Sequence, residues 1–309
     1  MIVTVTMNTA IDKTVELMKL ERGSLNRLHN VVIDPGGKGI NVSKTTKALG
    51  GETIACGFVG GSSGMIIEQA LKKQGIQSDF VRIDKETRTN LKVIEENGLV
   101  TELNEPGPLV SGEEIKALKD KLLSYAKEDT WFVIAGSIPR GVDKGIYRDI
   151  IQMVKEKGSK VFLDADGELF KLGLEAGPDM IKPNKGELLA YFQKDYIVDE
   201  NQLVEMGSRF LDKGVKMVAI SLGQQGAFFI NKEKVIQCVG LKVKAHSTVG
   251  AGDAMVAAIT YGLDKGMDLE SCIKLGMAVS AGAVTTQGTK PPDMVSVEEL
   301  KKQVEVIYL

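Results

Sequence analysis

Short runs of β-branched and other apolar residues alternate along the chain with longer stretches whose apolar residues recur every three or four positions. The runs predict strands, and the stretches predict amphipathic helices. Alternation of this kind is typical of βαβ units, in which helices cover both faces of a mostly parallel sheet. The expected strands are Ile2–Thr6, Thr53–Phe58, Trp131–Ala135, Lys160–Asp164, Met180–Ile181 and Met217–Leu222. The expected helices are Asn41–Leu49, Met65–Gln74, Glu113–Tyr125, Gly145–Lys157 and Gln202–Lys213, and Ser111 with Glu114 predicts a capping box for the third.

The pattern changes in two places. Towards the C-terminal end, an antiparallel hairpin is expected at Ala227–Asn231 and Val235–Val239, followed by helices at Ala254–Asp264, Leu269–Thr285 and Val297–Val306. Nearer the start, four strand-like runs have no helix between them: Thr14–Leu20 with Val31–Ile33, and Thr89–Ile94 with Val100–Leu103. We expect these four runs to form a small separate sheet that covers an active site.

The charge balance limits the partners of this protein. The chain has 39 Lys and Arg against 41 Asp and Glu, which gives a formal net charge of −2, and no block of five or six like charges occurs. Nonspecific binding of nucleic acid or of an anionic membrane therefore has no electrostatic basis. Any anionic ligand must meet a local group of cations.

Cysteine spacing and terminal composition predict the compartment. Cys56, Cys238 and Cys272 are far apart and form no C-x-x-C pair, which argues against a disulfide framework and a cysteine zinc site. The N-terminal stretch lacks the basic and long apolar regions of a signal peptide, and no apolar run reaches the ~18 residues of a membrane span. We expect a cytoplasmic protein.

Four glycine-bearing loops lie at or near expected strand-to-helix junctions. Backbone N–H groups at the start of a helix favour an anion, because they lack partners and lie at the positive end of the helix dipole. Glycines also simply permit tight turns, and both interpretations stay open for each loop. The loops are Gly36-Gly-Lys-Gly39, Gly60-Gly-Ser-Ser-Gly64, Gly136-Ser-Ile-Pro-Arg-Gly141 and Gly250-Ala-Gly-Asp253.

The last of these loops carries an acidic residue, Asp253, at which a helix is expected to begin. A carboxylate beside clustered backbone donors could accept a hydroxyl proton while the donors stabilise charge on a transferring phosphoryl group. An Asp at this position could equally be a structural N-cap.

Several common catalytic signatures are absent or weak. The chain has no G-x-x-x-x-G-K-[ST] loop, no G-x-G-x-x-G after a strand, and no protein-kinase catalytic loop. Gly60-Gly-Ser62-Ser-Gly64 does match the G-x-S-x-G elbow of serine hydrolases. That alternative requires His246, the only histidine after Ser62, to reach the serine.

Two long motifs, together with three shorter ones between them, resemble those of the ribokinase-like sugar kinases of the phosphofructokinase B family. The resemblance spans essentially the whole chain. Asn8-Thr-Ala-Ile-Asp12 with Asp34-Pro-Gly-Gly-Lys-Gly-Ile-Asn41 is similar to the first signature of the family, and Thr248-Val-Gly-Ala-Gly-Asp-Ala254 is similar to the second. Gly136–Gly141, Lys182–Glu187 and Ser221–Gly226 resemble further family elements.

The resemblance implies one three-layer α/β/α domain over residues 1–309, with a β-sheet lid from segments near 12–34 and 88–104. It also implies ATP as the phosphoryl donor and Mg²⁺ as a cofactor. Asp253 is then the catalytic base, and Gly250, Ala251 and Gly252 form the anion hole. Asn184 and Glu187 would organise Mg²⁺ through water, although the same pair could be the capping box of a helix.

The resemblance further implies two groups of binding residues. The sugar side comprises Asp12, Arg27, Gly36, Gly37, Lys38, Asn41, Arg88, Asn90 and Ser137. The ATP side comprises Lys182, Asn184, Ser221, Gly223, Gly226, Thr248, Gly250 and Gly252. Small residues at Ala278–Gly282 would form a wall for the adenine or, alternatively, pack helices together.

The cations near the lid favour a phosphorylated sugar, because a sugar phosphate needs charged donors that a free sugar does not. Lid closure is expected to bring Arg27, Lys38 and Arg88 around the substrate phosphate, although all three could be solvated charges. Thr87-Arg-Thr-Asn90 and Asn104-Glu-Pro-Gly-Pro108 resemble the branch that comprises 1-phosphofructokinase and tagatose-6-phosphate kinase.

The acceptor expected from this branch is fructose 1-phosphate, phosphorylated at its 6-hydroxyl. Tagatose 6-phosphate is the alternative, and a sugar-phosphate or nucleotide sensor with the same fold is a less favoured one. An apolar lid face with Val15, Leu17, Leu91 and Val93 predicts a homodimer formed through the lid.

Overall fold

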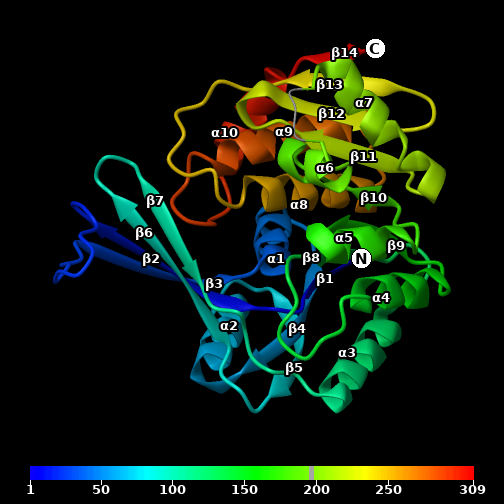
Figure 1. The fold of residues 1–309 in the computed structure, drawn as a ribbon. Helices are drawn as coiled ribbons and strands as arrows, with labels where there is room; N and C mark the ends of the chain where they lie inside the picture. The colour runs from blue at the N-terminus through cyan, green and yellow to red at the C-terminus, as the bar shows by residue number, and fades with distance from the viewer. Residues whose placement is uncertain (195–197) are drawn as a thin grey trace.

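The computed structural model describes residues 1–194 and 198–309 and contains two β-sheets, one of ten strands and one of four (Figure 1). The large sheet comprises β1 (Ile2–Thr6), β4 (Thr53–Gly60), β5 (Gln77–Ile83), β8 (Trp131–Ala135), β9 (Lys160–Asp164), β10 (Met180–Ile181), β11 (Met217–Ser221), β12 (Gly226–Ile230), β13 (Val235–Val239) and β14 (Val306–Tyr308). The small sheet comprises β2 (Ala10–Leu17), β3 (Asn30–Gly36), β6 (Arg88–Glu95) and β7 (Val100–Asn104).

The helices are α1 (Lys38–Ala48), α2 (Gly61–Lys73), α3 (Gly112–Tyr125), α4 (Ile146–Lys155), α5 (Gly167–Leu174), α6 (Lys185–Tyr191), α7 (Glu200–Ser208), α8 (Ala251–Asp264), α9 (Leu269–Ala283) and α10 (Met294–Lys302). Two short 3₁₀ turns, η1 (Leu211–Lys213) and η2 (Gly223–Gln225), complete the regular structure. None of the helices in the described ranges is long and apolar enough to cross a membrane.

The large sheet is mostly parallel, as the sequence predicts. Its strand order is β14-β13-β12-β11-β10-β9-β8-β1-β4-β5. Strands from β11 to β5 along this order pair in parallel, whereas β12, β13 and β14 extend the sheet in antiparallel fashion. The predicted α/β architecture is therefore confirmed.

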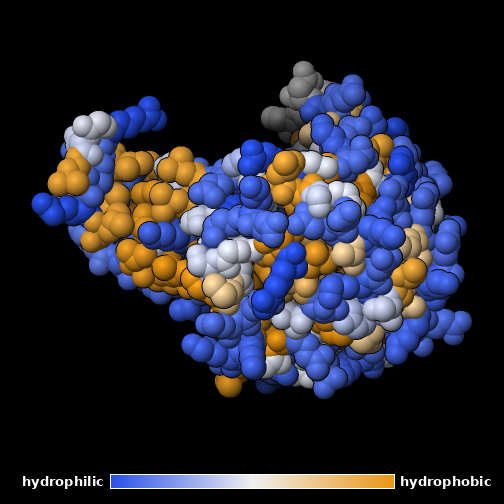
Figure 2. All heavy atoms as spheres, turned by 90° about the horizontal axis from the view of Figure 1, so that it is seen from below, coloured by the Kyte–Doolittle hydropathy of each residue, from blue (hydrophilic) through white to orange (hydrophobic). Residues whose placement is uncertain are grey.

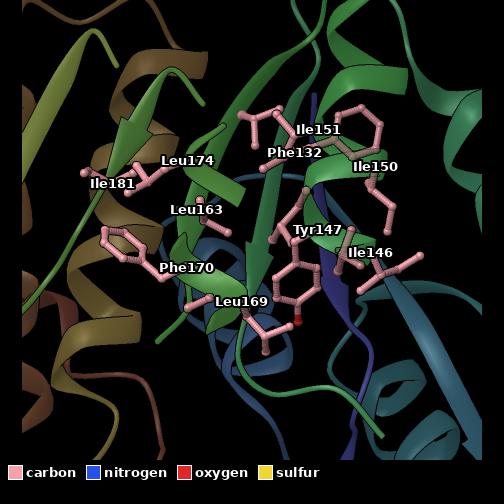
Figure 3. Close-up of a cluster of buried hydrophobic side chains, with 14 of the residues drawn as sticks. Phe132, Ile146, Tyr147, Ile150, Ile151, Leu163, Leu169, Phe170, Leu174 and Ile181 are labelled. Atoms are coloured by element: carbon pink, nitrogen blue, oxygen red, sulfur yellow. The ribbon is translucent and has the colours of Figure 1, made fainter. Parts of the chain in front are cut away.

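Alternation of side chains along the strands divides the core into two layers. Val3 and Phe132 pack with residues of α3 to α7 on one face of the sheet. Ile2, which precedes Val3, and Val133, which follows Phe132, pack with α1, α8, α9 and α10 on the other face. Figure 3 shows part of the first layer, in which Phe132 of β8 lies beside Ile151 and Tyr147 of α4. The two layers fix the strand ends from which the site is built.

Most of the predicted elements are confirmed, with shifted ends. Three predictions were wrong or incomplete at the periphery. β5 was missed because its charged residues hide the apolar pattern of an edge strand. The short helices α5 and α6 are too brief to show helical periodicity. The expected single helix at Val297–Val306 is instead α10 followed by β14.

The small sheet projects from the body at the left of Figure 1, with strand order β3-β2-β6-β7. β2 pairs in parallel with β6, and each of these strands pairs in antiparallel fashion with its other neighbour. The separate lid sheet that the sequence predicts is therefore present. Its strands begin nearer to the body than predicted, because β2 starts at Ala10 and β6 at Arg88.

Phe132 offers a test of the core. Its side chain is fully buried in β8. Replacing it with Ala is expected to lower the free energy of unfolding by about 3–5 kcal/mol, because the change removes apolar burial and leaves a cavity. Phe132→Leu, which fills most of that volume, should cost clearly less. Urea denaturation measures both, and equal losses for the two variants would contradict this account.

Candidate active site

A cavity of about 530 Å³ opens at the carboxyl ends of the parallel strands, beneath the lid sheet. Ligands commonly bind at this edge of open α/β sheets. Thr6, Ala135 and Asp164, which end β1, β8 and β9, line its floor. Asp12 and Asn90 line it from the lid. The fold therefore brings two separate sheets to one polar cavity.

Most of the sequence-predicted site residues line this cavity together. These are Asp12, Gly37, Lys38, Asn41, Arg88, Asn90, Ser137, Lys182, Asn184, Glu187, Ser221, Gly250, Gly252 and Asp253. The remaining ones are not among its lining residues: Arg27, Gly36, Gly223, Gly226, Thr248 and Ala251. Arg27 is exposed in the segment between β2 and β3, and Gly223 and Gly226 flank the turn η2.

Asp253 lies in the first turn of α8, which begins at Ala251, two residues earlier than predicted. Gly250 precedes the helix in a left-handed conformation, with φ of 81°. The carboxylate is buried, and its Oδ2 accepts a hydrogen bond from Asn41 Nδ2 at 2.9 Å. Asp253 is therefore not the N-cap, which leaves its carboxylate directed to the cavity that it lines.

The pKa of Asp253 is raised to about 6, first by burial and then by the nearby carboxylate of Asp164. Lys38, Asn41 and Lys182 act in the opposite direction by stabilising the ionised form. A carboxylate with such a pKa is ionised at neutral pH and yet is a stronger base than an ordinary Asp.

Asp164 is a site residue that the sequence analysis missed. It is buried at the end of β9, and its Oδ1 lies 3.3 Å from Lys38 Nζ and 3.6 Å from Lys182 Nζ. Burial alone would raise its pKa, but Lys182 and Lys38 outweigh burial and hold the pKa below the ordinary value. The available signal was its position as the acidic last residue of a buried strand, Lys-Val-Phe-Leu-Asp164.

The Asn184 and Glu187 pair forms the capping box of α6, which confirms that structural alternative. Glu187 N–H donates to Asn184 Oδ1 and Asn184 N–H donates to Glu187 Oε2, each at 2.9 Å. Both residues also line the cavity. The cap fixes their positions at the cavity wall, so it does not compete with a binding role.

On the lid side, Asp12 and Asn90 are neighbours in the β2–β6 register, and Asn90 Nδ2 donates to Asp12 Oδ1 at 2.9 Å. Burial raises the pKa of Asp12, although Asn90, Lys44 and Lys92 oppose this shift. Gly36 lies opposite, where an added Cβ would come within 2.2 Å of Asp12 Oδ2. The absence of a side chain at Gly36 therefore leaves room for the carboxylate of Asp12.

Lys44 was also missed by the sequence analysis. This buried residue of α1 donates from Nζ to Pro35 O at 3.2 Å and to Thr289 Oγ1 at 2.9 Å. Burial lowers the pKa of Lys44, and Asp34, Asp12 and Asp253 oppose that shift. The ammonium group thus joins the base of the lid to a segment that lines the cavity near Gly250.

Four residues that line the cavity each carry a buried side-chain oxygen that has no hydrogen-bond partner among the described residues. These oxygens are Thr6 Oγ1, Asn8 Oδ1, Asn41 Oδ1 and Asn90 Oδ1. Unsatisfied buried polar groups cost free energy and are rare away from functional sites. Their concentration here marks this part of the structure as a candidate functional site.

The serine hydrolase alternative finds no support in this geometry. Ser62 Oγ donates to Glu86 Oε1 at 3.1 Å at the start of α2, and the backbone N–H of His246 donates to Val284 O. Neither Ser62 nor His246 lines the cavity.

Comparisons with known proteins agree with this geometry. Residues 1–295 match the model of the pfkB family of carbohydrate kinases. A 1-phosphofructokinase of Borreliella burgdorferi is 34% identical over 99% of this chain and 98% of its own length. A tagatose-6-phosphate kinase of Staphylococcus epidermidis is 31% identical over 99% of both chains. A crystal structure of phosphofructokinase-2 from Escherichia coli in complex with substrates and products superposes with a TM-score of 0.93, at 29% identity over 98% of both chains.

The raised pKa of Asp253 predicts a pH-dependent stability effect of Asp253→Asn. Because the folded-state pKa exceeds the ordinary value of 3.8, ionisation of Asp253 destabilises the folded chain as the pH rises from about 3.8 through 6. The Asn side chain does not ionise, so the variant does not lose stability in this pH range. Its free energy of unfolding relative to the unmodified chain should increase by on the order of 2 kcal/mol between pH 4 and pH 7.5. Chemical denaturation at the two pH values tests this, and a difference that is independent of pH would contradict it.

Proposed function

Because the chain belongs to the pfkB family of carbohydrate kinases, we propose that it transfers the γ-phosphoryl group of ATP to the 6-hydroxyl of fructose 1-phosphate. The product is then fructose 1,6-bisphosphate. The observation that carries this proposal is the buried carboxylate of Asp253 at the start of α8, held by Asn41 and facing a polar cavity.

Asp253 acts as the general base. Its pKa of about 6 lies close enough to neutral pH for it to be ionised and still accept the proton of the attacking hydroxyl. Gly250 and Gly252 line the cavity beside it at the N-terminal end of α8. Their backbone N–H groups, with that of Ala251, stabilise the charge that develops on the transferring phosphoryl group.

The acceptor sugar lies between the lid and Asp253. Asp12 accepts hydrogen bonds from some hydroxyl groups of the sugar. The unpartnered oxygens of Asn41 and Asn90 accept hydrogen bonds from other hydroxyl groups of the sugar. Gly37 and Ser137 line the same part of the wall. This arrangement places the acceptor hydroxyl within reach of the base and excludes water when the lid closes.

Arg88 supplies the contact to the phosphate of the sugar. It lines the cavity from the start of β6, and its guanidinium group is fixed by hydrogen bonds to main-chain oxygens. Lys38 contributes less to this contact than the sequence predicts, because its ammonium group pairs with Asp164 beside Asp253. Arg27 is exposed on the lid and contacts the substrate only after the lid has moved.

The ATP side is formed by Lys182 and Asn184, which follow β10, and by Ser221, the last residue of β11. Gly223, Gly226 and Thr248 flank this wall and contact the nucleotide outside the cavity itself. Mg²⁺, when bound, neutralises phosphate charge in this reaction. Glu187, Asn184, Asp164 and Asp166 line the cavity and offer oxygen donors of the type that Mg²⁺ prefers.

The donor set suits a loosely held ion. Within the described part of the chain, no three His, Cys, Asp or Glu side chains form a ready metal cage. Mg²⁺ usually retains several waters and binds through one or two carboxylates plus substrate phosphates. Glu187 would then hold the ion through water.

Tagatose 6-phosphate, phosphorylated at its 1-hydroxyl, is the alternative acceptor. It presents a phosphate and a primary hydroxyl at opposite ends, as fructose 1-phosphate does, so one cavity could accept either. The similarity to a tagatose-6-phosphate kinase favours keeping this second candidate. A non-catalytic sensor is disfavoured because the base and its surrounding donors are intact.

We also propose that the chain forms a homodimer through the outer face of the lid. Val31 and Ile33 of β3 and Leu103 of β7 are 44%, 55% and 56% exposed. The strand register places them on the face of the lid that carries Val15 and Val93, opposite the face that carries Asp12 and Asn90. Val15, Leu17 and Val93 were expected to be exposed on this face, but they are buried within the single chain. Figure 2 shows apolar side chains gathered over the projecting lid. The lid of a second copy is the partner that matches this surface.

The acceptor prediction is tested by ADP release with Mg-ATP and fructose 1-phosphate, tagatose 6-phosphate, fructose 6-phosphate or free fructose. We expect the highest kcat/KM with fructose 1-phosphate. Asp253→Asn should lower kcat by at least about 100-fold with little change in substrate binding, because it removes the base. Preference for tagatose 6-phosphate would show that this sugar is the acceptor, and the proposed mechanism would be unchanged. Unchanged turnover in the variant would refute the role of Asp253.

The dimer prediction is tested by light scattering on the Ile33→Lys, Leu103→Lys double variant. Both side chains are exposed in the single chain, so the change should not impair folding. We expect a dimer for the unmodified protein and a monomer for the variant, because burying two lysines at the interface is costly. Val295→Lys, at a more exposed apolar position on α10, serves as the control and should remain dimeric. A monomeric unmodified protein would refute the proposal.

A further inference from the structure

Glu86 fills the N-terminal end of α2 from outside the helix. Its carboxylate accepts hydrogen bonds from Ser62 N–H at 3.2 Å, from Ser63 N–H at 2.6 Å and from Ser62 Oγ at 3.1 Å. Hydrogen bonds from Ser63 are the largest cause that holds the pKa of Glu86 below its ordinary value, and those from Ser62 act in the same direction. An added Cβ at Gly61, whose φ is 63°, would lie 1.8 Å from Glu86 Oε2. The glycine loop that resembles an anion site is therefore occupied by an anion of the protein itself.

The next residue, Thr87, is bound to the end of β4. Thr87 N–H donates to Gly60 O at 3.0 Å, and Gly60 N–H donates to Thr87 Oγ1 at 2.9 Å. Thr87 is buried. An added Cβ at Gly60 would lie 2.0 Å from Lys85 O, so glycine is required for this close approach.

The third consecutive residue, Arg88, is bound to two further segments. Its Nε and Nη2 donate to Asn8 O at 3.3 and 3.1 Å, and its Nη1 donates to Glu105 O at 2.9 Å. Arg88 lines the cavity as the first residue of β6. Glu86, Thr87 and Arg88 are thus each attached to a different neighbouring segment, and none of these segments is a distant part of the lid.

We propose that Glu86 is a positioning residue that fixes Arg88 for recognition of the phosphate of the substrate. This inference rests on the proposed function, in which Arg88 contacts that phosphate. Glu86 does not itself line the cavity. It acts by joining the start of the lid strand β6 to α2 in the body, so that Arg88 keeps its place when the outer lid moves.

This attachment changes how lid closure works. The sequence predicts that closure carries Arg88 to the substrate. In the structure, Glu86 and Thr87 are held to α2 and β4, and Arg88 is held to Asn8 and to Glu105 after β7. Under the proposal, the bending of the lid therefore begins beyond Arg88. The guanidinium group is then preorganised before the sugar phosphate binds, and binding does not have to order it.

Alanine at position 86 tests the proposal. We expect Glu86→Ala to raise KM for fructose 1-phosphate about tenfold, with kcat within twofold and KM for ATP unchanged, because Arg88 loses its support. Glu86→Gln, which retains one acceptor oxygen for the N–H of Ser63, should raise KM by about threefold. The matched control is Glu114→Ala. Glu114 accepts a hydrogen bond from Ser111 N–H in the capping box of α3, and it does not line the cavity.

A double-variant cycle shows whether the effect passes through Arg88. Arg88→Ala should raise KM for the sugar phosphate by itself, and adding Glu86→Ala should produce no further increase. Multiplying effects would overturn the proposal, as would an unchanged KM in Glu86→Ala or an equal rise in Glu114→Ala.

Hydrogen exchange provides a readout that does not depend on turnover. The amides of residues 86–90 should exchange at least tenfold faster in Glu86→Ala than in the unmodified protein, and should stay unchanged in Glu114→Ala. Unchanged exchange in Glu86→Ala would overturn the positioning role. Absence of turnover in the unmodified protein with every phosphorylated sugar, together with faster exchange in Glu86→Ala, would refute the proposed function and not the attachment of Arg88.

Discussion

The site depends on the ion pairs that join Asp164 to Lys38 and Lys182 at the carboxyl ends of the parallel strands. Asp164 and Asp253 are both buried, and two unpaired carboxylates in one cavity would each resist ionisation. The two ammonium groups remove most of that repulsion for Asp164. They also reduce, without cancelling, the rise in the pKa of Asp253. One carboxylate therefore stays a fixed anion while its neighbour retains the basicity that proton transfer requires.

The lid and the body meet through a few close contacts that allow little substitution. Gly36 leaves space for the carboxylate of Asp12, and Lys44 joins the main chain of Pro35 to Thr289. The segment from Glu86 to Arg88 attaches the other side of the lid to α2 and β4. The lid is thus attached to the body at two places, whereas the outer ends of its strands extend away from the body (Figure 1). In the proposed function, the part of the lid nearest the body stays fixed and its outer part moves when the sugar binds.

Much of the central fold follows from the sequence, because buried parallel strands are short apolar runs such as Trp131–Ala135. The glycine loops before Asn41 and Asp253 likewise predict most of the cavity wall. The roles of Asp164 and Lys44 depend in part on partners more than a hundred residues away in the chain, Lys38 and Thr289, which the local pattern of the sequence does not indicate. Glu86 was missed for a different reason, because the same glycine-loop pattern describes both an open anion site and a site that a carboxylate of the protein fills. The edge strand β5 and the short helix α6 lack a usable periodicity.

The filled end of α2 has a consequence for competition among anions. Solutions inside cells contain free phosphate and many phosphorylated metabolites, and an uncovered helix terminus near the cavity would attract them. The tethered carboxylate of Glu86 has a very high effective concentration at that position, so a dissolved anion has to displace it to bind there. Under the proposed function, Arg88 and the start of α8 remain open to free phosphate, which would compete there with the substrate.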